Sequence, residues 1–301
     1  MSVGLHNGHP RGGKVQLDLP IGAIDAANRP ARIPPPRLAT SPMLALKLTL
    51  VPLFLLLVSL SGRWWGPAVT GCLAALPAIA GPILYLITVE HGRAFGARAA
   101  LLALAAILAA EAFNFAYAWL CRRHRWPLAL TGAMVAWLVA AWGLTHLPAL
   151  PAWAIAAAAV GALTSQQFMP RAELPASVAP LGRVELGLRM LAGALLTLAV
   201  TALASWAGPS WSGLLAVFPL LSIVLCVSSQ RLHGSGFVIA LLRGMVTGRP
   251  AFAAFCLWLA LRLPHNAILP SFAEAALLAM LVQGAVRWQI GRRSRNAANA
   301  A

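Results

Sequence analysis

The stretch that decides the fold is GPAVTGCLAALP, from Gly66 to Pro77, which places two glycines and two prolines inside an apolar run. The same pattern returns as GPSWSGLLAVFP, from Gly208 to Pro219. Both residue types are unfavourable inside an ordinary buried helix, because glycine costs conformational entropy and proline removes a backbone donor. Their recurrence at the same spacing therefore indicates a repeated structural element.

A gapless shift of 142 residues aligns the two copies over a longer stretch. The identities that coincide rarely by chance are Trp64 with Trp206, Gly71 with Gly213, His91 and Gly92 with His233 and Gly234, Phe95 with Phe237, and Phe113 with Phe255. Matches of alanine and leucine carry little weight in a chain so rich in both. The sequence therefore predicts two tandem repeats of three to four helices each.

The composition places these repeats in a membrane. Sixty per cent of the residues are hydrophobic and 10% are charged, whereas a soluble domain carries about a quarter charged residues. Apolar runs of about 20 residues recur between residues 43 and 290, and each can cross roughly 30 Å of hydrocarbon at 1.5 Å per residue. The sequence therefore predicts an all-α, polytopic transmembrane bundle.

The net charge of +16 does not point to nucleic acid. The chain has only seven Asp and Glu residues, so the imbalance mostly reflects scarce acids. Basic residues such as Arg63, Arg183 and Arg287 lie at the ends of apolar runs, where they hold the orientation of a membrane protein. We therefore expect the lipid bilayer, and no nucleic acid, as the main partner.

The four cysteines, Cys72, Cys121, Cys226 and Cys256, indicate neither a disulfide framework nor a metal site. They form no CxxC pair and no Cys/His cluster with metal-ligand spacing. No nucleotide-binding loop, HExxH or nucleophile-elbow motif occurs in a credible context. We therefore expect no metal, no cofactor and no catalytic residues, and we interpret the chain as a protein that is not an enzyme.

Composition also divides the chain into parts. Met43 begins the first apolar run and is an alternative start of translation. The predicted parts are a disordered basic tail at 1–42, a first transmembrane repeat at 43–147, a connecting segment with a short apolar helix at 148–184, a second transmembrane repeat at 185–291, and a basic C-terminal tail at 292–301.

The connecting segment decides the topology. Helices are predicted at about 43–62, 66–89, 95–121, 127–147, 185–206, 209–231, 236–262 and 270–290. The 14 residues from Ala152 to Ser165 are short for a span. If they do not cross, about eight spans result and the repeats are parallel; if they cross, nine spans result and the repeats are inverted. With the N-terminal tail inside, the positive-inside rule favours eight spans, although the basic cluster Arg122–Arg125 then violates it.

Pro77 and Pro219 are predicted to kink the second helix of each copy. Pro67 and Pro209 stand at helix starts, where a missing N–H costs nothing. Pro77 and Pro219 lie ten residues further on, about 15 Å along the axis and so near mid-bilayer. Each would free a carbonyl four residues earlier, such as that of Leu73. Two interpretations stay open: the kinks line a substrate path, or they form a closely packed helix seam.

Four polar residues inside apolar runs are candidates for an ion or substrate path: Glu111, Asn114, Arg243 and Gln283. Asn114 falls on the same helix face as Glu111, three residues later. Acids inside membranes are costly and usually face a cavity or a partner. A proton-coupled carrier needs such an acid; a neutral glutamic acid bonded to another helix is the structural alternative.

The partners of these polar residues are also open at this stage. Arg243 or Arg249 is the candidate partner of Glu111 or of an anionic group. Arg243 has a second interpretation, in which its side chain extends to the membrane interface. Gln283 lies deep in the last predicted helix, where interhelical hydrogen bonding is the simpler interpretation.

Residues 213–245, GLLAVFPLLSIVLCVSSQRLHGSGFVIALLRGM, resemble GlpM-type proteins. Those are small three-helix bacterial inner-membrane proteins with a G-L-x-x-x-F-P element followed by a loop and an L-R…G-M helix. The likeness is carried by Gly213, Leu214, Phe218, Pro219, Leu242 and Arg243. The first copy departs from it, with Leu76 in place of Phe218 and Leu101 in place of Arg243. The resemblance implies a duplicated bacterial cytoplasmic-membrane protein and supplies no mechanism.

Two functions from different classes fit these features. The first is a small proton- or ion-coupled secondary carrier of unknown substrate in the bacterial cytoplasmic (inner) membrane, with Glu111 as its proton or cation site. The second is a non-catalytic membrane protein that supports a partner complex, for example in envelope polysaccharide assembly. A small molecule or ion is the expected partner in the first case, and a membrane protein or a second copy in the other.

Overall fold

The computed structural model describes residues 42–77, 80–146, 150–171, 182–206 and 218–299. These residues form helices and short turns and contain no strand. They belong to a single compact unit, Leu38–Ala301. The all-helical fold class is therefore confirmed for this part of the chain, whereas the predicted N-terminal tail lies almost wholly outside it.

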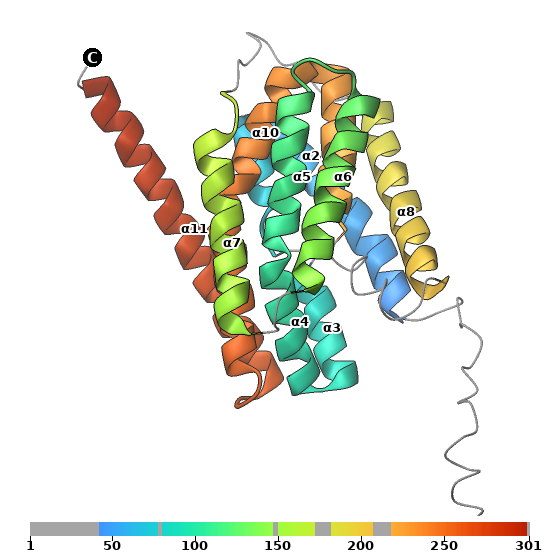
Figure 1. The fold of residues 1–301 in the computed structure, drawn as a ribbon, viewed down its shortest axis with the longest axis vertical. Coiled ribbons are helices and arrows are strands. Elements are labelled where there is room, and N and C mark those ends of the chain that lie inside the picture. Colours follow the sequence, from blue (N-terminus) through green and yellow to red (C-terminus); the bar gives the residue numbers. More distant parts are fainter. Residues whose placement is uncertain (1–41, 78–79, 147–149, 172–181, 207–217, 300–301) are drawn as a thin grey trace, which may run out of the picture. The chain divides into compact units, whose positions relative to one another are not determined.

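The helices appear in Figure 1 under the labels used below. In chain order they are α2 (Pro42–Ala74), α3 (Ala80–His91), α4 (Arg93–Ala105), α5 (Ile107–Leu120), α6 (Trp126–Thr145), α7 (Pro151–Phe168), α8 (Arg183–Trp206), α10 (Leu220–Arg262) and α11 (Ile268–Asn299). Within the described residues, four segments have the length and apolar composition to cross a membrane. They are Arg93–Leu120, Trp126–Thr145, Leu220–Arg262 and Ile268–Arg292.

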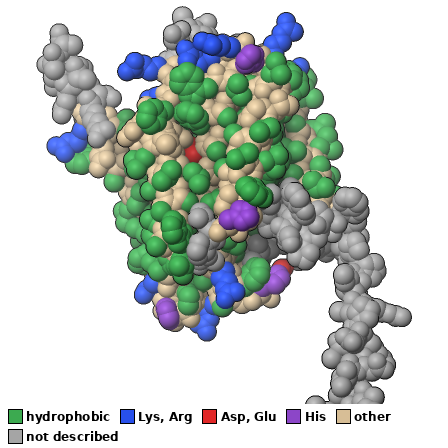
Figure 2. Space-filling view, viewed as in Figure 1, with side chains coloured by type: hydrophobic (Ala, Val, Ile, Leu, Met, Phe, Trp, Pro, Cys, Tyr) green, Lys and Arg blue, Asp and Glu red, His purple; other side chains and the backbone are tan. Residues whose placement is uncertain are grey.

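Charged and apolar side chains are segregated along these helices. Figure 2 shows Lys and Arg gathered at the two ends of the visible face and hydrophobic side chains over the band between them. The large apolar side chains that are exposed include those of Leu102, Val139 and Leu281. Such a band suits contact with lipid, so the structure agrees with the membrane assignment.

Three glycines with positive φ interrupt the helices. Gly66 breaks α2 (φ 81°, ψ 175°), Gly92 separates α3 from α4 (φ 87°, ψ 168°), and Gly234 breaks α10 (φ 79°, ψ −178°). A side chain is strained at such angles, which explains the residue type. Gly92 and Gly234, 142 residues apart in the chain, thus share one backbone conformation.

The histidines beside these two glycines also make matching contacts. The ring of His91 lies 4.9 Å from that of Phe95 between centroids, and the ring of His233 lies 4.5 Å from that of Phe237. In each pair the two rings face one another across the glycine turn. The sequences HGRAF and HGSGF therefore fold into similar local structures.

The two prolines predicted to kink helices lie instead at helix boundaries. Residues 75–77 form a turn after α2 ends at Ala74, so Pro77 stands in the link that precedes α3 rather than inside a continuous helix. The Leu73 carbonyl is not freed, because it accepts the N–H of Leu76 at 3.1 Å. Pro219 is the N-cap of α10. The part of the predicted helix 209–231 that precedes Phe218 lies outside the described residues.

The segment of α2 after Gly66 packs very closely on the second half of α10. A Cβ added at Gly71 would lie 1.8 Å from the Leu241 oxygen, and one added at Gly244 would lie 2.0 Å from the Ala68 oxygen. A Cβ at Gly248 would meet the Cys72 oxygen at 2.6 Å. Small residues that let two backbones approach are typical of membrane helix pairs. This part of the Gly-Pro element is therefore a packed seam.

The contacts also fix the relative direction of several helices. Arg189 of α8 contacts Ser59 of α2, and Gly193, one turn later, packs on Leu55, one turn earlier in α2. The first part of α2 and α8 therefore run antiparallel. The second half of α10 is placed by similar contacts. Its Arg243 lies against the C-terminal end of α7, and Arg249, six residues further along α10, contacts Glu111 near the start of α5.

Helix α7 runs parallel to α5 over much of its length. Gly161 packs on Leu108 and Glu111, and the indole Nε1 of Trp119 donates to the Phe168 carbonyl at 3.1 Å. The second half of α10 passes both helices in the opposite direction. The short apolar segment predicted at 152–165 is thus part of an 18-residue helix that packs along α5.

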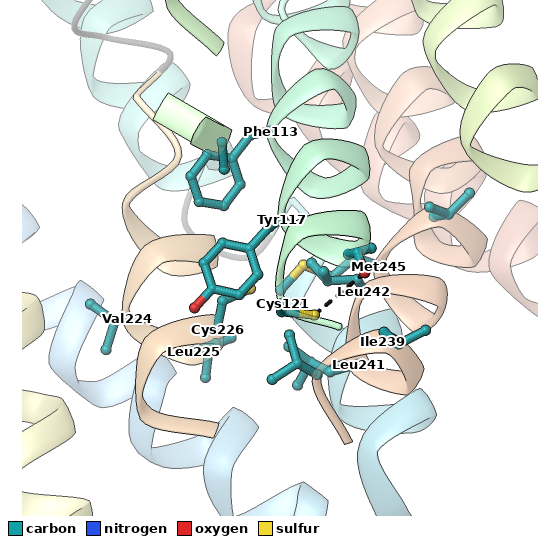
Figure 3. Close-up of a cluster of buried hydrophobic side chains, with 14 of the residues drawn as sticks. Phe113, Tyr117, Cys121, Val224, Leu225, Cys226, Ile239, Leu241, Leu242 and Met245 are labelled. Carbon is teal, nitrogen blue, oxygen red and sulfur yellow. Dashed lines mark hydrogen bonds between the residues drawn. The ribbon is translucent and has the colours of Figure 1, made fainter. Parts of the chain in front are cut away.

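The largest buried side chains lie where α5, α6 and α10 meet. Phe113 and Tyr117 of α5 pack with Leu225, Cys226 and Met245 of α10 in one hydrophobic cluster, which Figure 3 shows in close-up. The Tyr117 hydroxyl lies 2.8 Å from the side-chain oxygen of Gln230 and donates to it. This core fixes α5 against α10 and so positions the polar residues one to two turns away.

Candidate functional site

An ion pair joins α5 to α10 inside the bundle. Arg249 Nε lies 2.5 Å from Glu111 Oε1, and their side chains are 13% and 1% exposed. A helix boundary and a proline lie near these residues: α4 gives way to α5 at Ala106, and Pro250 removes one backbone donor from α10. Of the two arginines considered as partners of Glu111, the structure selects Arg249.

Asn114 completes this polar group and leaves two acceptors without donors. Its Nδ2 donates to Glu111 Oε1 at 3.3 Å. Glu111 Oε2 and Asn114 Oδ1 are both buried and have no hydrogen-bond partner in the structure. Buried acceptors normally find a donor. An unpartnered carboxylate oxygen next to an unpartnered amide oxygen therefore forms a suitable place for a proton or a small cation.

An apolar pocket of about 220 Å³ adjoins the arginine. Its walls come from α4, α5, α7 and α10 and include Leu104, Ile107, Ile155, Leu257 and Arg249. Arg249 borders this pocket, whose surface is almost wholly apolar, and Glu111 is not part of the wall. The Arg249 side chain is 13% exposed, whereas that of Glu111 is 1% exposed and stays covered.

Helix α7 provides that cover. A Cβ added at Gly161 would lie 3.0 Å from Leu108 Cα and 3.4 Å from Glu111 Cβ, so α7 approaches α5 closely at this point. The segment predicted to be only a connector therefore forms one wall of the site. Its glycine was not identified as a functional residue from sequence, because nothing local in an Ala-rich stretch marks it.

Arg243 lies apart from the ion pair. Its Nη1 donates to the carbonyls of Met169 and Pro170, at 3.1 and 3.3 Å. These carbonyls lie at the C-terminal end of α7, where a cation interacts favourably with the helix dipole. Arg243 therefore fastens α7 to α10 and does not pair with Glu111; it is an exposed residue, so its extension to the membrane interface stays a prediction.

Gln283 belongs to a third place in the bundle. It is 8% exposed, and its Nε2 lies 2.7 Å from Cys72 Sγ of α2. Its Oε1 is buried without a hydrogen-bond donor. The four polar candidates are therefore not one cluster: the structure brings Glu111 and Asn114 together and leaves Arg243 and Gln283 elsewhere.

One buried charge was not identified from sequence. Arg189 of α8 is 4% exposed and donates to the hydroxyls of Ser59 and Ser229, each at 3.3 Å. In sequence it follows Glu185 by four residues, which is typical of an exposed helical pair. Its burial depends on α2 and α10, which are distant in sequence, so no local signal marks it.

The described residues contain no group of three or more His, Cys, Asp or Glu side chains placed to hold a metal ion. Comparison with known proteins adds no relative: no family model, no curated protein and no solved structure matches the chain. The resemblance of residues 213–245 to GlpM-type proteins therefore stays a prediction.

Proposed function

We propose that this chain is a small proton-coupled secondary carrier of the bacterial cytoplasmic (inner) membrane, with Glu111 as its proton site. The observation that supports this most strongly is the buried Glu111–Arg249 pair, in which Glu111 Oε2 has no hydrogen-bond partner and which adjoins the unpartnered Asn114 Oδ1 and an apolar pocket. An ion pair in a membrane interior is costly to desolvate and marks functional sites. It is therefore better explained by exchange of ions than by stability.

The pair offers a simple coupling device. A proton taken up at Glu111 neutralises the carboxylate and removes the charge that holds Arg249. The guanidinium, released from Glu111 beside the apolar pocket, then attracts an anionic or strongly dipolar group of a small substrate. Loss of the substrate favours return of the Arg249 contact and release of the proton. Each ligand thus biases the same two-state contact, as linkage requires.

Inverted repeats would let such a carrier open toward either side of the membrane. Several contacts support an inverted arrangement of the two repeats. The helices matched by the 142-residue shift run in opposite directions: the first part of α2 against α8, and α4–α5 against the second half of α10. The carbonyls of His124 and Asn266 occupy equivalent positions. Each accepts a side-chain donor, from Gln230 at 3.0 Å and from Arg93 at 3.3 Å.

This arrangement requires nine crossings rather than the eight that the charge distribution favours. Helix α7 runs with α5 past the depth of Glu111 and ends beside Trp119. An odd number of segments between the repeats inverts the second copy. We therefore propose the nine-span, inverted alternative. Basic residues then occur on both sides, in keeping with their presence at both ends of the face in Figure 2.

The proposal is tested with the purified protein in lipid vesicles that contain a pH-sensitive dye. Small carboxylates, amino acids and sugars are added in turn, and substrate-dependent proton entry is recorded. Glu111→Gln is expected to abolish this entry. Glu274→Gln, which alters the exposed Arg262–Glu274 pair, is the matched control and should retain it.

Two results would overturn the proposal. The first is substrate-dependent proton entry that is equal in the wild type and in Glu111→Gln. The second is a wild type without proton entry for any compound, together with one dominant membrane protein recovered by cross-linking in cells. That second result would favour the alternative function, support of a partner complex by a membrane protein without transport activity.

A further inference from the structure

Arg189 is a buried cation without a matching anion among the described residues. It lies where α2, α8 and α10 meet and is 4% exposed. Nη1 and Nη2 donate to Ser59 and Ser229 at 3.3 Å, while Nε is buried and has no acceptor. The ion pairs found in the described part of the chain are Glu111–Arg249 and Arg262–Glu274, and neither involves this residue.

Two other arginines of the same bundle have the carboxylate or carbonyl partners that Arg189 lacks. Arg249 contacts a carboxylate, and Arg243 contacts two carbonyls at a helix C-terminus. Arg189 has only two neutral hydroxyls, at distances longer than the usual 2.9–3.0 Å. Removing a guanidinium from water costs several kcal/mol unless a negative charge compensates it. The surroundings of Arg189 do not supply that compensation by direct contact.

The nearby titratable groups do not change this conclusion. Glu185 lies one turn earlier on α8 and acts on Arg189 through space, but it is not within ion-pair distance, since no such pair occurs there among the described residues. His233 lies one turn beyond Ser229 on α10 and also interacts electrostatically with Arg189. On the other side, Gly193 packs directly on Leu55 and closes the interface.

The hydroxyl groups of Ser59 and Ser229 can each donate a hydrogen bond to a ligand. In a membrane helix a serine hydroxyl commonly bonds the carbonyl three or four residues earlier, as Ser61 does with Val58 and Ser228 with Val224. Among the described residues, Ser59 and Ser229 make no such bond; their oxygens accept from Arg189. Their hydroxyl hydrogens are therefore available to a ligand that lies beside the guanidinium.

We propose that Arg189, Ser59 and Ser229 form a binding site for a small monovalent anion, either a halide such as chloride or a small carboxylate. The guanidinium provides one positive charge, which matches one negative charge in a dry environment. Nε and the two hydroxyls provide donors from three helices around the guanidinium. The site does not depend on the carrier function, because it would hold together α2, α8 and α10 in any membrane protein of this fold.

The test measures the thermal unfolding midpoint of the detergent-purified chain at constant ionic strength. Sodium chloride or sodium acetate is titrated against sodium gluconate. The wild type is expected to show a saturable rise in the midpoint with chloride or with acetate, and the more effective ion identifies the preferred shape. The double variant Ser59→Ala/Ser229→Ala should need at least tenfold more of that ion.

Two arginine variants show whether the response arises at this site. Arg189→Gln should lose the response entirely, while Arg243→Gln, which removes another arginine of the bundle, should keep it. An equal response in the wild type and in the serine double variant would overturn the proposal, even if Arg189→Gln does not fold. A wild type that responds to neither ion would also overturn it.

Discussion

Arg249 donates from Nε to Glu111 Oε1 at 2.5 Å, across two helices that run in opposite directions. The Glu111 side chain is 1% exposed and that of Arg249 is 13% exposed, and Arg249 also borders an apolar pocket. The two members of the pair thus have different access to their surroundings. This asymmetry is what an exchange site needs, because one partner can be approached while the other stays protected.

The pair should stabilise the fold less than its geometry suggests. Removing one member leaves a buried charge without compensation, so Glu111→Gln should lower the free energy of unfolding by about 3–5 kcal/mol. Replacing both, as Glu111→Gln/Arg249→Met, should cost clearly less than that single change. Denaturant or thermal unfolding in detergent measures the cycle. A double variant less stable than either single variant would contradict an exchange role.

The glycine seam between α2 and α10 should tolerate no side chain. Gly71→Ala places a methyl 1.8 Å from the Leu241 oxygen, a backbone atom that cannot move aside, and should destabilise the fold by at least about 1–3 kcal/mol. Gly284→Ala is the matched control, because nothing lies within 4 Å of that position. It should be neutral or stabilising. Equal unfolding midpoints for the two variants would argue against the seam.

The glycine turn in α10 should be sensitive to backbone conformation alone. Gly234 has φ of 79° and open space around it, so Gly234→Ala should cost about 1–2 kcal/mol through strain. Gly187→Ala, in α8, has equally open space without a positive φ and should cost nothing. Unfolding measurements on both variants separate strain from packing. A harmless Gly234→Ala would show that the turn is not fixed as described.

The direction of α7 can be tested by labelling. Single cysteines at Leu150 and Arg171, in a chain without its four native cysteines, flank α7. In intact cells or sealed vesicles, a membrane-impermeant thiol reagent should label one position and not the other, because α7 crosses. Labelling of both from the same side would restore the eight-span alternative and, with it, parallel repeats.

The sequence predicted those features that depend on local pattern. Long apolar runs indicated the helices, and the spacing of Glu111 and Asn114 placed both on one face of α5. Arg249 was named as a partner of Glu111, although only a three-dimensional contact could choose between it and Arg243. The HG turns were visible as matched residues, and their shared positive φ explains why both positions are glycine.

Other features depend on contacts that no local pattern reveals. Pro77 indicated a kink, but the helix ends before it, because the Leu73 carbonyl closes a tighter turn with Leu76. Helix α7 was underestimated, since its C-terminal end contains polar residues and its role lies in covering Glu111. Arg189 was missed because its burial requires serines from two distant helices.

The central claim is that Glu111 binds and releases a proton within the membrane-embedded bundle. The most direct measurement is infrared difference spectroscopy of the lipid-reconstituted protein between high and low pH, following the carbonyl stretch of protonated carboxyl groups. We predict a band that Glu111→Gln eliminates and Glu274→Gln retains. A spectrum that Glu111→Gln leaves unchanged would contradict the claim.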